Sequence, residues 1–307
     1  MFYAGIDVSK DTLDLFLNGK FFRHTNDSRG IAALKRRLRV DCTAVVESTG
    51  GYERKCAEAL RAAGIPVAVV NPFRVAHYRK ALGLHAKTDV IDAELLARFG
   101  QDRELADTGA EQHPELNDVT DRRHQLVGIL AAEKNRLEHA RGEARASVLR
   151  HIGQLEAEID AMEQVIASLV AADDLLRRKS EVLRTIKGFG PAITPVLLAT
   201  MPELGGLNRR EIASLAGLAP FAHDSGRWRG KRSIRGGREL ARRMLYMAAM
   251  TARSWNPEIK LMYARLRAAG KAPKVALIAC ARKLLTIANA RLRDTFGSPK
   301  AKLAIQP

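Results

Sequence analysis

The sequence contains few cysteines: Cys42, Cys56 and Cys280 lie far apart in a chain of 307 residues. They form no C-x-x-C pair and cannot make a fully paired disulfide set. These two facts exclude a secreted disulfide scaffold and a structural zinc site built on cysteine pairs.

Long apolar runs are also absent. The longest, such as residues 65–70 and 275–281, fall well short of the roughly 18 residues that a membrane span needs. The chain opens on a strand-like segment and not on a basic one, so no secretory leader is expected. With 46% apolar residues it has enough material for the cores of two domains, which excludes disorder. We therefore expect a soluble, cytoplasmic protein.

Acidic residues become scarce in the last part of the chain. Residues 1–180 carry 27 Lys/Arg and 27 Asp/Glu, whereas residues 181–307 carry 24 and 7, so the net charge of +17 lies wholly in the second part. Such a surplus attracts polyanions, of which nucleic acid is the commonest in a cytoplasm. The basic residues are spread over several segments and do not form one amphipathic helix, so no membrane partner is expected.

The first 110 residues alternate between strand-like and helix-like segments. Short β-branched and aromatic runs predict an opening antiparallel meander, and later strands alternate with helices, which indicates a mixed α/β sheet. The expected strands are residues 2–8, 12–17, 21–24, 43–47 and 66–70, and the expected helices are 28–38, 53–63 and 89–99.

Residues 115–180 contain no proline, and their apolar residues recur at helical spacing. Two long helices are expected, either as a coiled-coil hairpin or as part of a plain bundle. Beyond residue 181, Gly and Pro separate short helical pieces, which predicts a mainly α domain. The division expected is thus 1–110, 111–180 and 181–307.

The turn from Lys187 to Gly190 has the form of a helix-hairpin-helix. Its glycines, Gly188 and Gly190, would present backbone N–H groups to a phosphate, although an ordinary helix turn fits the same residues.

Four carboxylates in the first domain have the spacing of a metal site. Asp7 lies within an apolar strand and Glu47 ends another, while Asp89 and Asp92 share one face at the start of a helix. Taken singly, Asp7 also fits a turn residue at a strand end and Glu47 a surface charge. The Asp89 and Asp92 pair also fits a charge pattern favoured at a helix N-terminus. Together they follow the order used by RNase H-like folds, and their oxygens suit Mg²⁺. Other acidic residues are interpreted as solvated charges: Asp11, Asp14 and Glu94.

Several motifs resemble those of the insertion-sequence family one-ten transposases, also called bridge recombinases. Residues 5–10 (GIDVSK), 47–51 (ESTGG) and 87–93 (KTDVIDA) resemble the family's RuvC-like DEDD domain. Residues 215–220 (LAGLAP), 224–226 (DSG) and 235–238 (RGGR) resemble its C-terminal transposase domain.

The resemblance implies a DNA recombinase that works on donor and target DNA with a noncoding bridge RNA as guide. Asp7, Glu47, Asp89 and Asp92 take the DEDD positions, and Ser225 takes the position of the nucleophile. Ser233, in a similar basic context, is the competing serine. Exchange between two duplexes also implies a homo-oligomer, a dimer or a tetramer.

A serine nucleophile needs charge stabilisation at phosphorus, and basic residues are dense around Ser225. The candidate phosphate clamps are Arg227, Arg229, Lys231, Arg232, Arg235, Arg238 and Arg242.

Three other functions fit parts of the sequence. A Holliday-junction resolvase would use the carboxylates alone to activate water and leave Ser225 without a catalytic role. An actin-like kinase or ATPase also opens with a strand such as residues 5–8, but it needs a second phosphate loop. A non-enzymatic RNA- or DNA-binding protein would account for the basic part and leave the carboxylates unexplained.

Overall fold

The computed structural model describes residues 2–38, 41–84, 86, 88–108, 113–221, 224–225, 228–230 and 232–297. The described residues divide into two compact units, one within residues 2–108 and the other within residues 113–297.

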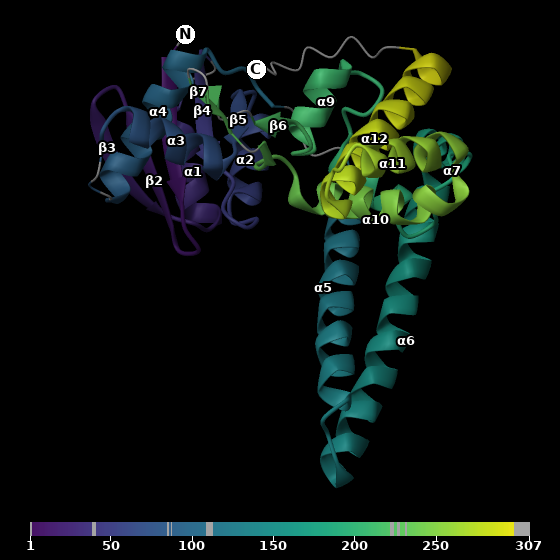
Figure 1. Cartoon of the computed structure of the whole chain (residues 1–307). Coiled ribbons are helices and arrows are strands. Elements are labelled where there is room, and N and C mark those ends of the chain that lie inside the picture. The colour runs from purple at the N-terminus through teal and green to yellow at the C-terminus, as the bar shows by residue number, and fades with distance from the viewer. Residues whose placement is uncertain are drawn as a thin grey trace. The chain divides into compact units, whose positions relative to one another are not determined.

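The first unit is built on a five-stranded mixed sheet of order β3-β2-β1-β4-β5 (Figure 1). β1 pairs antiparallel with β2, and β2 with β3, whereas β1, β4 and β5 are parallel. The strands are β1 (Phe2–Val8), β2 (Thr12–Leu17), β3 (Lys20–Thr25), β4 (Cys42–Glu47) and β5 (Val67–Val70). The helices are α1 (Ser28–Arg37), α2 (Arg54–Ala62), α3 (Pro72–Ala81) and α4 (Asp89–Arg103).

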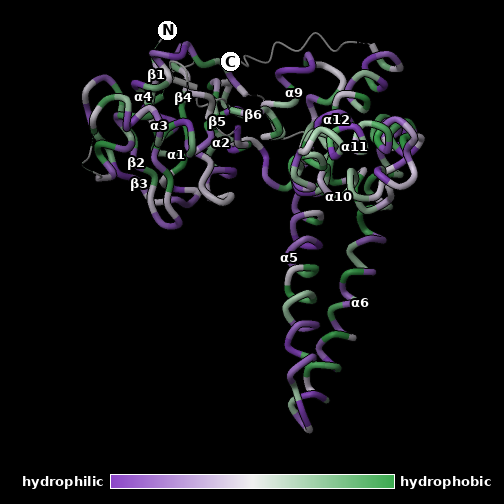
Figure 2. The backbone as a smooth tube through the Cα atoms, in the orientation of Figure 1, coloured by the Kyte–Doolittle hydropathy of each residue, from purple (hydrophilic) through white to green (hydrophobic). Residues whose placement is uncertain are grey.

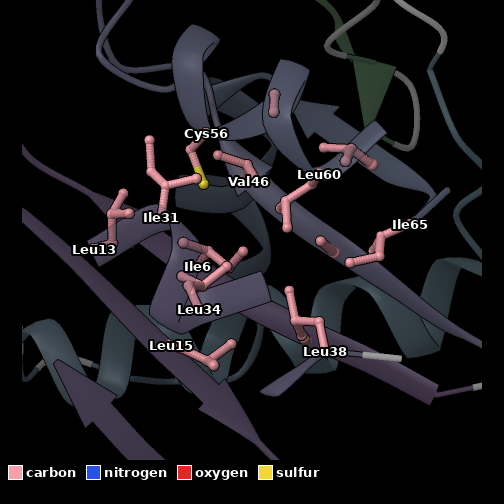
Figure 3. Packing of buried hydrophobic residues seen from close by; sticks show 14 of the residues in the cluster. Ile6, Leu13, Leu15, Ile31, Leu34, Leu38, Val46, Cys56, Leu60 and Ile65 are labelled. Carbon is pink, nitrogen blue, oxygen red and sulfur yellow. The ribbon is translucent and has the colours of Figure 1, made fainter. Parts of the chain in front are cut away.

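Each face of the sheet has its own core. On one face, Ile6 and Val46 pack with Leu34 of α1 and Leu60 of α2 (Figure 3). On the other face, Val45 packs with residues of α3 and α4 that include Tyr78, Leu95, Leu96 and Phe99. Burial of each such leucine stabilises the fold by about 2 kcal/mol. This arrangement confirms the predicted RNase H-like α/β class.

The cysteines belong to the packing. Cys42, Cys56 and Cys280 are buried free thiols. Burial raises the pKa of Cys42 to about 11 and that of Cys56 to about 12, so both remain protonated at neutral pH.

The second unit begins with two long helices, α5 (Pro114–Leu137) and α6 (Gly142–Ala172), which contact each other. Leu126 of α5 packs with Leu155 and Ile159 of α6. Hydrophobic residues are interspersed with hydrophilic ones along both helices (Figure 2), as expected for a helix pair whose outer faces are exposed to solvent. The predicted helical insert is therefore confirmed.

The remainder of the second unit is mainly helical, as expected. Its helices are α7 (Asp174–Arg184), α8 (Thr194–Thr200), α9 (Arg209–Leu215), α10 (Glu239–Trp255), α11 (Pro257–Ala268) and α12 (Pro273–Phe296). α10, α11 and α12 contact one another, and α12 also packs on α7 and α9. Buried Asn289 of α12 accepts a hydrogen bond from Gly205 N and donates one to Leu207 O, each at 2.8 Å.

Two details differ from the sequence-based expectation. Helix α3 is absent from the predicted elements, and α10 and α12 are longer than the short pieces expected after residue 181. Between α9 and α10 the chain also forms four two-residue strands: β6 (Pro220–Phe221), β7 (Asp224–Ser225), β8 (Trp228–Arg229) and β9 (Ser233–Ile234).

Among the described residues, no helix combines the length and the apolarity that crossing a membrane requires.

Candidate active site

Asp7 and Glu47 lie at the carboxyl ends of two neighbouring parallel strands. The last paired residues of β1 and β4 are Ile6 and Val46, so Asp7 and Glu47 follow side by side. Because side chains alternate along a strand, both point away from the core that holds Ile6 and Val46. Both are half-buried. The fold thus places these two predicted ligands on one face at one end of the sheet.

Helix α4 lies on that same face and brings the other two carboxylates to the same end. A Cβ on Gly5 would lie 1.9 Å from Ala93 O and 2.5 Å from Ala97 N, so only glycine lets α4 pack this closely on β1. Further along α4, Gly100 lies over Tyr3, so the helix runs antiparallel to the strand. The amino end of α4 therefore lies toward Asp7.

Asp89 and Asp92 occupy the first turn of α4. The Thr88 side chain accepts a hydrogen bond from Ile91 N at 3.3 Å and starts the helix at this point. Negative charge in the first turn is favoured by the helix dipole. All four sequence-predicted carboxylates therefore come from elements that converge on one end of one sheet face.

A buried aspartate extends this group across the sheet. Asp14 of β2 pairs directly with Asp7 of β1 and, on its other side, with Arg23 of β3. The Arg23 guanidinium donates to both Asp14 oxygens, at 2.7 and 3.1 Å. The Asp14 side chain is only 3% exposed. The expectation that Asp14 is a solvated charge is therefore wrong, since its neighbours exclude water.

Two arginines pair with the carboxylates of α4. Arg23 donates to Asp89 as well as to Asp14, and these hydrogen bonds, that to Asp14 first, raise the pKa of Arg23. Arg79 of α3 donates to Asp92 and, at 2.9 Å, to the carbonyl of Ala86 just before α4. Both arginines were missed at the level of sequence.

The donor set fits a hard divalent cation, which prefers carboxylate oxygens. Within the described ranges, no three His, Cys, Asp or Glu side chains are gathered closely enough to hold a metal ion. Asp89 and Asp92 instead have arginine partners. To hold a cation together with Asp7 and Glu47, Asp89 and Asp92 would have to leave these arginines.

The loop after Glu47 is organised by a buried carboxylate. Glu53 accepts hydrogen bonds from Ser48 Oγ at 3.2 Å, Thr49 N at 3.0 Å and Gly51 N at 2.9 Å. It is 6% exposed. Glu53 thereby fixes the residues that follow Glu47, a role that its place at the start of a helix did not indicate.

Ser225 lies in a small hairpin of the second unit. The backbone of β7 pairs antiparallel with β8, with Ser225 opposite Trp228 and Asp224 opposite Arg229. The side chains of Ser225 and Arg229 fall outside what the structure describes, as do Arg227 and Lys231.

The competing serine lies on a different strand pair. Ser233 of β9 is exposed and pairs with Phe221 of β6. Arg232 beside it is exposed. The exposed Arg235 lies over the Phe221 ring, with its Cζ atom 4.9 Å from the ring centroid. These two predicted phosphate contacts remain accessible to solvent.

Two of the resembling motifs, residues 215–220 and 235–238, pack directly on each other. A Cβ on Gly217 would lie 2.1 Å from Gly236 O, and one on Gly237 would lie 2.2 Å from Gly217 N. Arg238 N donates to Leu215 O at 2.9 Å. These glycines therefore allow close backbone packing between the two motifs.

Arg238 and Arg242 support this packing. The Arg238 guanidinium donates to both oxygens of Glu203, whose side chain is 7% exposed, and to Thr200 O at 2.8 Å. Arg242 donates to Gly236 O. To contact a phosphate, Arg238 would have to leave the buried carboxylate of Glu203. The density of basic residues in the sequence did not indicate this ion pair.

The segment expected to form a helix-hairpin-helix lies between α7 and α8. Gly188 has φ +119°, and a Cβ there would lie 2.9 Å from Ala252 Cβ of α10, whereas Gly190 has nothing within 4 Å. Asn256 donates to Lys187 O at 3.2 Å, and the Lys187 side chain is exposed. Gly188 therefore seats the turn on α10, and Lys187 and Gly190 face open space.

Comparison with known proteins gives matches over most of the chain. The family model of the DEDD transposase domain matches residues 4–140, and that described as "Transposase IS116/IS110/IS902 family" matches residues 180–264. The chain is 28% identical to the pilin gene-inverting protein of Moraxella lacunata over 95% of its own length and 96% of that protein. It is 33% identical to an uncharacterized protein of insertion element IS110 from Streptomyces coelicolor, over 44% of this chain and 33% of that protein. An uncharacterized protein of insertion element IS900 from Mycobacterium paratuberculosis is 32% identical, over 47% and 37%.

Proposed function

Because the chain belongs to the IS110/IS116/IS900 family of transposases, enzymes that transfer DNA strands, we propose that it cuts and rejoins donor and target DNA through Ser225. The proposal includes Mg²⁺ at Asp7, Glu47, Asp89 and Asp92 and a noncoding guide RNA. We assign the carboxylate chemistry to residues 1–110, assembly to 111–180 and nucleic-acid binding to 181–307.

The observation that carries the proposal is the convergence of four carboxylates on one end of one sheet face, in a chain whose family is a DEDD transposase family. The family implies a divalent metal ion, and carboxylate oxygens suit Mg²⁺ among such ions. When bound, the ion supplies charge stabilisation at the phosphate. Asp7, Glu47, Asp89 and Asp92 would hold the ion, and Glu53 and Arg79 keep the surrounding loop and helix in place.

The proposed role of Ser225 is nucleophilic attack. A bond forms between Ser225 Oγ and phosphorus while the phosphodiester bond to the leaving sugar oxygen breaks. The serine loses one proton and the leaving oxygen gains one, so the step is neutral overall. The phosphoserine bond retains the energy of the phosphodiester, and the strand can be rejoined without ATP. The exposed Arg232 and Arg235 would stabilise charge on the phosphate.

One relative supports rejoining in particular. The protein of Moraxella lacunata is named for inverting a pilin gene. Inversion requires that DNA be broken at two positions and joined again. A covalent intermediate accomplishes this without free ends.

The decisive experiment compares Ser225→Ala with wild type on labelled donor and target DNA, with Mg²⁺ and RNA transcribed from the DNA that flanks the gene. Ser233→Ala is the matched control, because Ser233 is an exposed serine on a separate strand and follows the basic Arg232. A denaturing gel should show protein-linked DNA for wild type and Ser233→Ala and none for Ser225→Ala. Strand exchange without any adduct, or by Ser225→Ala, would support a resolvase-like nuclease instead.

The carboxylates are tested separately. Asn at positions 7, 89 and 92 and Gln at position 47 should each abolish strand exchange while leaving the circular dichroism spectrum unchanged. Normal activity of Asp7→Asn would contradict the metal site.

For the guide RNA, the support is the concentration of positive charge beyond residue 181. Affinity for structured RNA and for duplex DNA should both fall with salt, with a log–log slope of about −0.9 per neutralised phosphate on duplex DNA. Affinities that stay flat between low and moderate salt would contradict this part.

For the oligomer, the support is the pair α5 and α6, which leaves large apolar side chains exposed, including Val127, Ile129 and Leu149. A second copy could cover them. Light scattering should show a dimer or tetramer with RNA and DNA present, and a stable monomer would contradict it.

A further inference from the structure

The two arginines of the carboxylate site have separate anchors of their own. Arg23 holds Asp14, whose side chain is 3% exposed, with two hydrogen bonds. Arg79 holds the carbonyl of Ala86 at 2.9 Å. Each anchor leaves the arginine in position when its second partner, Asp89 or Asp92, is withdrawn.

The ion pair between Arg23 and Asp89 is weaker than the ion pair between Arg79 and Asp92. Arg23 and Asp89 are 52% and 59% exposed, and a pair so exposed to water contributes little to stability. Arg79 and Asp92 are 18% and 15% exposed, so their attraction is screened less. A cation that takes both carboxylates therefore has to displace Arg79 above all.

Displacement leaves Arg79 without a carboxylate partner and Arg23 with Asp14 alone, beside a cation site. Their remaining donors need an anion, and phosphate oxygens match the fork of a guanidinium as carboxylates do. The scissile strand brings such oxygens to the same end of the sheet.

We propose, on the basis of the metal site put forward above, that Arg23 and Arg79 neutralise Asp89 and Asp92 in the DNA-free protein and transfer to phosphate oxygens of the bound strand when a divalent cation takes the carboxylates. Metal and DNA then bind cooperatively. The metal frees the two arginines for phosphate by taking the aspartates, and the phosphates free the two aspartates for metal by taking the arginines. By linkage, the factor by which DNA tightens metal binding equals the factor by which metal tightens DNA binding.

The test measures Mn²⁺ binding by calorimetry, with and without duplex donor DNA, in a Ser225→Ala background that prevents cleavage. Arg79→Gln is the main variant, and Arg23→Gln is the second. Lys80→Gln is the matched control, since Lys80 is the exposed neighbour of Arg79 on α3 and loses the same charge. Thermal denaturation checks that each variant is folded.

Without DNA, Arg79→Gln should bind Mn²⁺ at least threefold more tightly than the background protein, because no cation has to be displaced from Asp92. Added DNA should tighten Mn²⁺ binding several-fold in the background protein and in Lys80→Gln, and clearly less in Arg79→Gln. If Arg79→Gln matches Lys80→Gln in both measurements, the exchange is overturned while the metal site stands. If Asp7→Asn binds Mn²⁺ as well as the background protein, or if neither binds it, the proposed metal site fails and the exchange fails with it.

Discussion

Asp7 and Asp14 lie directly opposite each other on the antiparallel strands β1 and β2, with their side chains on the same face of the sheet. Two like charges in this position repel each other. Arg23, opposite Asp14 on the next strand, offsets the repulsion through its two hydrogen bonds to Asp14. The arginine is therefore part of the fold as well as of the proposed exchange.

This relationship predicts an asymmetry between two substitutions. Arg23→Gln should lower the free energy of unfolding by more than Asp14→Asn does, because it leaves the buried Asp14 carboxylate without its cation. Asp14→Asn should cost about 1 kcal/mol, since the Arg23 side chain is half exposed and water solvates it. Urea denaturation measures both, and equal losses would contradict the asymmetry. Asp11→Asn, in the exposed turn after β1, is the control and should change little.

The loop that follows Glu47 should depend on Glu53. Glu53→Ala removes the acceptor of two backbone N–H groups and of the Ser48 hydroxyl. The free energy of unfolding should fall by about 2 kcal/mol, because three hydrogen bonds to a buried carboxylate are lost. Strand exchange should fall as well, since the loop positions Glu47. Glu58→Ala, on the exposed side of α2, should leave both unchanged.

The turn before α8 provides a pair of glycines with opposite expectations. Gly188→Ala should lower the free energy of unfolding by about 2 kcal/mol, because φ is +119° and the new methyl group would meet Ala252. Gly190→Ala has open space and should change stability by less than about 0.5 kcal/mol. Chemical denaturation of the two variants under identical conditions distinguishes them. Equal stability of the two variants would mean that the turn does not pack against α10.

Substitution of Arg238 should lower folding stability, whereas substitution of Arg232 should lower only the affinity for DNA. Arg238→Gln leaves Glu203 buried without its cation and should cost about 3 kcal/mol of folding free energy. Arg232→Gln should leave stability unchanged, since Arg232 is exposed, while lowering affinity for duplex DNA. The log–log salt slope should become shallower by about 0.9 if Arg232 contacts one phosphate. An unchanged slope would remove Arg232 from the interface.

The sequence was sufficient for the elements of the first unit other than α3 because their patterns are local. The short runs of β-branched and aromatic residues at 2–8 and 12–17 lead to the observed strands, and the helical segments at 28–38 and 89–99 lead to α1 and α4. Helix α3 was missed although Asn71 caps it and Pro72 starts it, a signal that was available. The strands β6 to β9 have two residues each, too few to show any period.

The side-chain partners of the site were not predictable in the same way. Arg23 and Asp89 are 66 residues apart, and nothing in the neighbourhood of either indicates the other. Arg232 and Arg238 look equivalent in a basic sequence, but only Arg238 lies beside a buried carboxylate. Charge is visible in a sequence, whereas the water around a charge depends on the tertiary structure.

The pair of α5 and α6 has most of its burial near one end. Leu116, Thr120 and Leu126 are buried in α5, but between residues 134 and 151 no residue is buried. That end is joined by exposed ion pairs, such as Lys134 with Glu156 at 2.8 Å. Backbone amides near residues 134–151 should therefore exchange with deuterium through small local openings, faster than those near Leu116 and faster still in high salt. The hairpin thus opens from its tip, and it can adapt its tip to a neighbour without loosening the helices at its base.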